Sequence, residues 1–244
     1  MSRKLLKISY LGTRFCGWQV QPNGLSVQEV LGNALQRLLG EKVKISGCSR
    51  TDSGVHAREF YLHFDTQTKI PNKGIVLGLN TYLPNDISAV SCIDVENDFH
   101  ARYNAKGKTY RYEIYFSQIP NPFLEGRMLR LKKEPDFERA KEFCRLMVGE
   151  HDFASFSSAN RTVSNTVRKV SCCLVEKENN TWIFTVTANG FLYNMVRIMV
   201  GSMLYFAEGK IDENDILSAF SREDRALLGN TAPPEGLYLQ KVEY

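Results

Sequence analysis

One carboxylate lies within a run of small polar residues that can hold it in a fixed direction. The run is Gly47-Cys48-Ser49-Arg50-Thr51-Asp52-Ser53-Gly54, and its composition predicts a loop. Backbone amides and hydroxyls in such a turn can aim the Asp52 side chain, and an aimed, ionised carboxylate can serve as a nucleophile or a base. Aspartate is also common in turns for structural reasons, because its side chain bonds to nearby amides. The local pattern leaves both interpretations open.

Two further residues have side chains suited to a binding site, although each also has a structural explanation. Tyr110 belongs to an alternating row over residues 110–116, which is typical of the core-facing side of a strand. Arg197 lies in the stretch 192–206, which predicts a helix, and a surface position there is the alternative. His56 follows the carboxylate loop, and a structural hydrogen bond explains it better than an acid-base pair.

Apolar periodicity predicts strands and helices in both halves of the chain. Leu6, Ile8 and Tyr10 alternate with polar residues, as in a strand with one buried face. Ser26 and Glu29 form a capping-box pattern before an apolar helical stripe that ends at residue 40. The other expected elements are strands at 43–45, 60–65, 87–93, 109–116, 166–175 and 182–187, a short helix after residue 71, and helices at 136–147 and 192–206. This mixture predicts an α+β fold.

Composition and charge restrict the class of protein. Hydrophobic residues make up 43% of the 244 residues and charged residues 24%, which predicts a globular protein with a sizeable core. The net charge of +4 favours polyanionic partners only weakly. The six cysteines form no C-x-x-C pair and have no histidine at zinc-ligand spacing, so we expect no metal. The first eight residues lack an apolar stretch suited to a signal peptide, and no transmembrane run occurs, so we expect a cytoplasmic protein without a membrane partner.

A longer motif surrounds the candidate carboxylate. Arg50-Thr51-Asp52-Ser53-Gly54-Val55-His56-Ala57 resembles the R-T-D-x-G-V-H-A signature of the TruA family of tRNA pseudouridine synthases. Other blocks resemble that family in its order: Gly17-Trp18-Gln19, Ser26-Val27-Gln28-Glu29, Leu83-Pro84-Asn85-Asp86-Ile87, Phe99-His100-Ala101-Arg102, Lys108-Thr109-Tyr110-Arg111-Tyr112, Asn194-Met195-Val196-Arg197 and Glu235-Gly236-Leu237-Tyr238-Leu239. The family often has Gly in place of Ser49 and Ala in place of Ser53. The joint occurrence of these blocks over nearly the whole chain makes the resemblance strong.

The resemblance implies a fold and an activity. The fold is that of pseudouridine synthases, with two similar α+β lobes around a mixed, largely antiparallel sheet and a central active-site cleft. Residues 1–104 would form the N-terminal lobe with the catalytic Asp loop, and residues 105–244 the C-terminal lobe with the active-site Tyr and Arg. The implied reaction converts uridine to pseudouridine at positions 38, 39 and 40, in the anticodon stem-loop of tRNA, within a homodimer. Because no atom or electron is gained overall, no cofactor is expected.

The resemblance also implies roles for individual residues. Asp52 would be the nucleophile, Tyr110 would pack on the target base, and Arg197 would keep Asp52 ionised. Arg50 would contact the substrate. Cations near these motifs can also follow the phosphates of an RNA, and the candidates are Arg50, Arg58, Arg102, Lys106, Lys108, Arg111, Arg168 and Lys169.

Two other classes of protein remain as alternatives. An RNA-binding module would use the basic and aromatic residues without catalysis, and the presence of Asp52, Tyr110 and Arg197 together argues against it. An N-glycosidase also uses a carboxylate to support cleavage of a carbon-nitrogen bond. It releases free uracil, whereas a pseudouridine synthase releases none.

Overall fold

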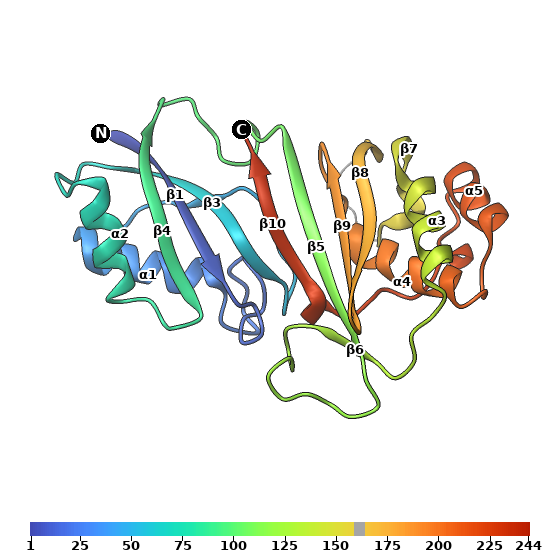
Figure 1. The fold of residues 1–244 in the computed structure, drawn as a ribbon. Coiled ribbons are helices and arrows are strands. Elements are labelled where there is room, and N and C mark those ends of the chain that lie inside the picture. The colour runs from blue at the N-terminus through green and yellow to red at the C-terminus, as the bar shows by residue number, and fades with distance from the viewer. Residues whose placement is uncertain (159–163) are drawn as a thin grey trace. The chain divides into compact units, whose positions relative to one another are not determined.

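The computed structural model describes residues 1–158 and 164–244, and their contacts fall into two compact units. Unit 1 comprises Met1–Lys106 and Tyr238–Tyr244, and unit 2 comprises Gly107–Leu237. Both units combine strands with helices (Figure 1), which confirms the α+β class. The last seven residues belong to unit 1, although the sequence expectation grouped them with residues 105–237.

The strands of unit 1 are ordered β4-β1-β3-β10, with β2 also paired to β3. β1 runs antiparallel to both β3 and β4, and β10 runs parallel to β3. The register places Tyr238 of β10 opposite His56, the first residue of β3. The bounds are β1 Ser2–Tyr10, β2 Ser46–Gly47, β3 His56–Thr66, β4 Ile87–Val95 and β10 Leu237–Glu243. The segment before β3 carries the motif with Asp52.

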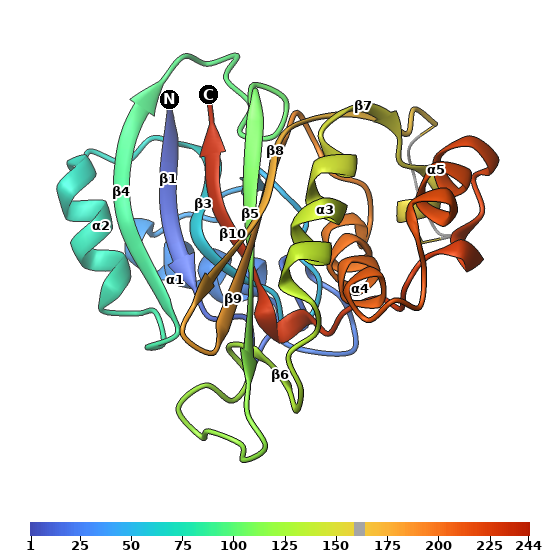
Figure 2. The same cartoon turned by 45° about the vertical axis from the view of Figure 1, so that its right-hand side comes forward.

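Two helices, α1 Val27–Leu39 and α2 Asn72–Asn80, lie side by side against the strands of unit 1 (Figures 1 and 2). Ser26 caps α1 by accepting the Glu29 N–H at 3.2 Å, and Gly40 ends it in the left-handed conformation at φ 72°. The buried side chains between helices and strands form one core, which includes Leu6, Ile8, Leu31, Leu35, Phe60, Leu62 and Phe64. These contacts hold the loops at the strand ends in place.

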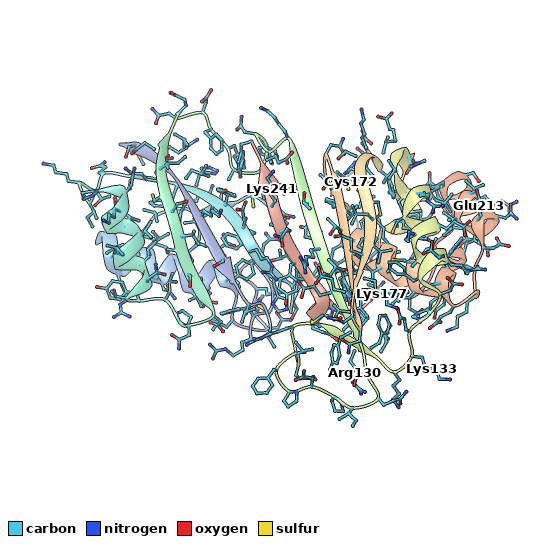
Figure 3. The ribbon with its side chains drawn as sticks, viewed as in Figure 1. Arg130, Lys133, Cys172, Lys177, Glu213 and Lys241 are labelled. Atoms are coloured by element: carbon cyan, nitrogen blue, oxygen red, sulfur yellow. The ribbon has the colours of Figure 1, made fainter. Side chains whose placement is uncertain are left out.

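The strands of unit 2 are ordered β5-β9-β8-β7, all antiparallel to their neighbours, with β6 parallel to β5. Their bounds are β5 Gly107–Phe116, β6 Leu129–Leu131, β7 Gly149–Asp152, β8 Val167–Glu178 and β9 Thr181–Ala188. Trp182 of β9 is fully buried and donates its indole N–H to Glu134 at 2.8 Å. Lys177, labelled in Figure 3, forms an ion pair with the same carboxylate at 2.6 Å. The buried indole N–H therefore has an acceptor, and that acceptor's charge is balanced by Lys177.

In the described part of unit 2 the helices are α3 Phe137–Met147, α4 Met195–Ala207 and α5 Glu213–Arg222, and short 3-10 turns lie at Ala154–Phe156, Arg225–Leu227 and Pro234–Gly236. α3 packs against both α4 and β8 (Figure 2). α4 is almost entirely buried, and among the described residues Arg197 is one of the two α4 positions not classed as buried. A charged residue in such a helix needs polar partners.

Most of the elements expected from periodicity are confirmed, with small shifts. The strand expected at 43–45 lies instead at Ser46–Gly47. The helix expected from residue 192 begins at Met195. Asn194 has a left-handed backbone at φ 60°, so the right-handed helix cannot extend toward the N-terminus through this residue. β6, β7, α5 and β10 were not expected from the patterns. Within the described part of the chain, no helix is long and apolar enough to cross a membrane.

Candidate active site

Backbone hydrogen bonds help to fix the Asp52 loop. It connects β2 to β3 and lies against the loop that follows β1. The Trp18 N–H donates to the Thr51 carbonyl at 3.1 Å, and the Gly54 N–H donates to the Phe15 carbonyl at 3.2 Å. Within the turn, the Val55 N–H donates to the Asp52 carbonyl at 3.2 Å. These bonds flank Asp52 on both sides and therefore set the direction in which its side chain leaves the turn.

Glycines allow the two loops to approach this closely. Gly17 has φ +100°, and a Cβ atom placed on it would lie 2.5 Å from the Thr51 carbonyl oxygen. A Cβ atom on Gly12 would overlap the Val55 carbonyl group. Only glycine fits where two backbones meet in this way. The G-W-Q block of the sequence therefore packs directly on the Asp52 motif.

The side chains around Asp52 differ in their exposure. Thr51 is buried, and its hydroxyl is bonded to the Tyr10 hydroxyl at 2.8 Å. Asp52 itself is half-buried, while Arg50 and Ser53 are exposed. A carboxylate at the boundary between core and solvent can be reached by a ligand and still keeps its direction. This geometry suits a reacting group, and the part of the chain that the structure describes holds no cluster of His, Cys, Asp and Glu able to bind a metal.

His56 has a structural role in this loop. It is fully buried, and its Nδ1 accepts the Gly12 N–H at 2.8 Å. Because Nδ1 is an acceptor, the ring proton resides on Nε2 and the ring is neutral. The ring also packs on Tyr238 with centroids 4.6 Å apart. This arrangement agrees with the structural interpretation of His56 drawn from the sequence.

Tyr110 of unit 2 lies on β5, opposite Val186 of β9. Its side chain is 7% exposed, and its ring meets Phe191 edge to face, with centroids 5.0 Å apart. Such a contact holds the plane of a tyrosine ring fixed. Tyr110 is therefore an oriented aromatic surface rather than a mobile one.

The Arg197 side chain, in unit 2, is fixed by hydrogen bonds that its own guanidinium donates. Its Nε–H donates to the Ala232 carbonyl at 2.7 Å, and one terminal nitrogen donates to the Asn194 side-chain oxygen at 3.0 Å. Asn194 in turn donates to the Ser158 hydroxyl at 2.8 Å. In the opposite direction, the Ala232 N–H donates to the Arg197 carbonyl at 3.0 Å. The segment at residue 232 and the first turn of α4 thus fix each other.

Glycines also bring that segment against α4. A Cβ atom on Gly201 would overlap the Asn230 carbonyl, and one on Gly229 would overlap the Gly201 carbonyl. The Gly229 N–H donates to the buried Ser202 hydroxyl at 3.1 Å. The close approach of these backbones therefore places the Ala232 carbonyl where it can accept from Arg197.

The candidate RNA-binding cations are divided between the units. Arg58 is exposed, with its guanidinium carbon 5.1 Å from the Tyr238 ring centroid, and the half-buried Arg102 lies on the turn before β5. Lys108 is half-buried on β5. Arg168 donates to the carbonyls of Asn165 and Val167 at 3.1 and 2.7 Å, and burial lowers its pKa from the ordinary value.

Arg111 is the clearest exception among these cations. Its Nε lies 2.9 Å from a carboxylate oxygen of Glu113, and both belong to β5. A guanidinium that is already paired is a weaker candidate for a phosphate contact than an exposed one.

Tyr112, which the sequence presents only as part of an apolar row, makes a polar contact with the segment that holds Arg197. Its hydroxyl donates to the Pro233 carbonyl at 2.7 Å.

Comparison with known proteins matches this chain to one family. A family model described as tRNA pseudouridine synthase matches residues 7–104 and 143–244. Proteins named tRNA pseudouridine synthase A are 40% identical over 244 residues in Thermoanaerobacter sp. (strain X514) and 42% identical over 245 residues in Ruminiclostridium cellulolyticum, each covering 100% of both chains. Among solved structures, a crystal structure of a Cbf5-Nop10-Gar1 complex aligns with 82% of this chain and 44% of that one, at 16% identity and a TM-score of 0.36.

Proposed function

Because the chain belongs to the tRNA pseudouridine synthase family, whose members isomerise uridine in tRNA, we propose that it acts in the anticodon stem-loop with Asp52 as nucleophile. The observation that supports this assignment is the geometry of the Asp52 loop. Main-chain hydrogen bonds of this loop set the direction in which the half-buried carboxylate leaves the turn. Positions 38, 39 and 40 are the proposed targets.

The chemistry of the isomerisation explains what such a carboxylate does. The bond between uracil N1 and the sugar C1′ breaks, the base turns, and a bond forms between C5 and C1′. The hydrogen on C5 leaves as a proton and N1 gains one, so atoms and electrons balance without a cofactor. A carboxylate assists by attacking the sugar C1′ or the base, and either attack splits one difficult step into two easier ones.

The base must be held while it is detached, and we assign that role to Tyr110. A base stacked on an aromatic ring is stabilised by roughly 1–3 kcal/mol. The edge-to-face contact of Tyr110 with Phe191 keeps its ring in one plane, which suits a stacking surface. Arg197 is the proposed partner that keeps the carboxylate ionised, since a nearby cation lowers the pKa of a carboxyl group. Arg50, exposed two residues before Asp52, is a proposed substrate contact.

The target base has to leave its helical stack before it can be attacked. This extrusion costs a few kcal/mol and is easiest in loops and at the ends of stems. The anticodon stem-loop meets that requirement, and exposed Arg58 together with Arg102, Lys108 and Arg168 would hold its phosphates. We further propose a cytoplasmic homodimer of two-lobed subunits, as expected from the family resemblance.

The decisive experiment compares Asp52→Asn with the parent protein and with Asp98→Asn, which removes a carboxylate from an exposed position in unit 1. The substrate is a tRNA transcript carrying tritium at uridine C5, because formation of the new bond releases that label into water. We expect turnover to fall by about four orders of magnitude or more in Asp52→Asn and to be unchanged in Asp98→Asn. Binding of tRNA, measured by filter retention, should persist in all three proteins.

Other outcomes would identify the alternatives. Release of free uracil by the parent, detected by nucleoside mass spectrometry, would identify an N-glycosidase. Binding of tRNA without tritium release across several tRNAs would identify an RNA-binding protein. If pseudouridine forms outside positions 38–40, as mapped by carbodiimide-primer extension, the proposed target is wrong while the activity stands. Full activity in Asp52→Asn would exclude this residue as the nucleophile.

A further inference from the structure

Tyr112 lies on the same face of β5 as Tyr110, because residues two apart on a strand point in the same direction. Its side chain is fully buried, and its hydroxyl donates to the Pro233 carbonyl at 2.7 Å. A buried hydroxyl with one well-made bond fixes the group that it contacts. The contacted group is the carbonyl of Pro233. The preceding residue is Ala232, and the Ala232 carbonyl accepts from Arg197 at 2.7 Å.

The segment at 232–233 therefore has one anchor on the strand and one on the helix. Tyr112 donates to the Pro233 carbonyl, and Arg197 donates to the Ala232 carbonyl. Pro233 stiffens the link between these two carbonyls, since its ring fixes the backbone angle φ that lies between them. A displacement of one carbonyl is thus transmitted to the other.

The ring of Tyr112 has little freedom to move. A Cβ atom on Gly236 would lie 2.5 Å from its Cε1 atom, so the chain passes directly over the ring. Burial raises the pKa of Tyr112 far above its ordinary value, with the Glu235 carboxylate adding to the shift and Arg197 opposing it. The hydroxyl consequently keeps its proton, and its bond to Pro233, across the working pH range.

From this geometry we infer that Tyr112 is a positioning residue for the reaction: its hydroxyl holds the Ala232–Pro233 segment so that the Ala232 carbonyl fixes the direction of the Arg197 guanidinium. The inference rests on the proposed role of Arg197. It assigns Tyr112 no contact with the substrate. It explains why a tyrosine, rather than a phenylalanine of the same size, occupies a fully buried position two residues after Tyr110.

The test variant is Tyr112→Phe, which removes only the hydroxyl. The matched control is Tyr115→Phe, because Tyr115 lies on the same strand, is 2% exposed, and its hydroxyl accepts the Asn121 N–H at 3.2 Å on a different loop. We expect the single-turnover rate of tritium release to fall about five- to tenfold in Tyr112→Phe, as for loss of one hydrogen bond. The rate should be unchanged in Tyr115→Phe, and tRNA affinity should be unchanged in both.

A double-mutant cycle with Arg197→Lys separates positioning from a general structural role. If Tyr112 acts through Arg197, the Tyr112→Phe change has no further effect on the rate in the Arg197→Lys background. An equal loss in both backgrounds, or no loss in the parent background, would overturn the inference. An Arg197→Lys protein as fast as the parent would instead contradict the proposed role of Arg197.

A second measurement does not depend on activity. In protein labelled with ¹⁵N-arginine, the Nε–H of Arg197 should exchange with solvent several-fold faster in Tyr112→Phe than in Tyr115→Phe, because its acceptor is less well held. Equal exchange in the two variants would overturn the inference even if the protein proved inactive on every tRNA. Absence of tritium release by the parent, with faster exchange in Tyr112→Phe, would overturn the proposed function alone.

Discussion

Asp52 and Arg197 are held in place by different kinds of contact. Around Asp52 the main chain makes hydrogen bonds through the amides of Trp18, Gly54 and Val55, and these bonds set where the half-buried carboxylate leaves the loop. Around Arg197 the guanidinium itself makes the bonds, to the Ala232 carbonyl and the Asn194 side chain. The first set of bonds lies in the main chain of the loop, and the second set is made by the side chain of the functional residue itself.

This difference predicts how each site responds to mutation. A change of the Asp52 side chain leaves the main-chain bonds of its loop intact, so activity and stability should separate. A change of the Arg197 side chain removes bonds that join α4 to the segment at residue 232, so activity and stability should fall together. Substitutions at the glycines of unit 1 should lower stability and activity together, because they disrupt the backbone contacts on which the Asp52 loop depends.

The largest effect on stability is expected from Gly17→Ala. The new methyl group would meet the Thr51 carbonyl oxygen at 2.5 Å, and φ +100° is unfavourable for alanine. Because the contact is with backbone, the free energy of unfolding should fall by more than about 3 kcal/mol. Urea denaturation measures this change, and tritium release should fall with it.

Gly32→Ala is the matched control for that substitution. Gly32 lies within α1, and a Cβ atom there meets nothing within 4 Å. Alanine is favoured over glycine inside a helix, so this variant should be more stable than the parent by about 0.5–1 kcal/mol. Equal stability of the two glycine variants would show that the close approach of Gly17 to the Asp52 loop is not required.

Arg197→Ala should lower stability by less than Gly17→Ala, and Asp52→Asn should lower it least of the three. Loss of the guanidinium leaves the Ala232 carbonyl without its donor, and the unfolding free energy should fall by about 1–3 kcal/mol. Asp52→Asn keeps the shape of the side chain and the main-chain bonds of its loop, so it should lower stability by less than Arg197→Ala does. Both variants should have low activity. A loss of stability in Asp52→Asn as large as that in Arg197→Ala would break the comparison between the two sites.

Parts of the fold follow directly from local sequence signals. Ser26 before α1 accepts an amide hydrogen of the first turn, as its capping-box pattern predicts, and Asp136, expected as the first helical residue, caps α3 in the same way. Asp212 and Asp215 form a complete capping box at the start of α5, so the sequence contains a sufficient signal for this helix too. Caps are local, and a reader of the sequence can use them without knowing the fold.

Other features depend on residues far apart in the chain. The alternation in β5 predicts that Tyr112 is buried, yet its partner Pro233 lies 121 positions away and no periodicity identifies it. The start of α4 is set by the left-handed backbone of Asn194, whose side chain bonds to Ser158. The types of residue at the candidate site are predictable from motifs, whereas the contacts that orient them emerge only from the packed structure.

The smallest expected effect concerns acid, and it again separates the two units. Three of the four histidines lie in unit 1 and one, His151, lies in unit 2. His63 accepts the Ala101 N–H at 3.1 Å through Nδ1, which requires a neutral ring. Burial, followed by the charges of His100 and Arg3, lowers the pKa of His63 from 6.5 to about 4, and Asp65 only partly opposes this.

The sign of the pH dependence follows from these pKa values. Between pH 6.5 and about 4 the unfolded chain binds a proton at His63 and the folded chain does not, so unit 1 loses stability as the pH falls through this range. Hydrogen exchange should therefore show weaker protection of the Ala101 amide at pH 5 than at pH 7, after correction for intrinsic rates. The Gly229 amide of unit 2, bonded to Ser202, should keep its protection. His63→Gln supplies an acceptor that does not titrate, and it should flatten the response at Ala101; an unchanged response there would assign the acid sensitivity to another group.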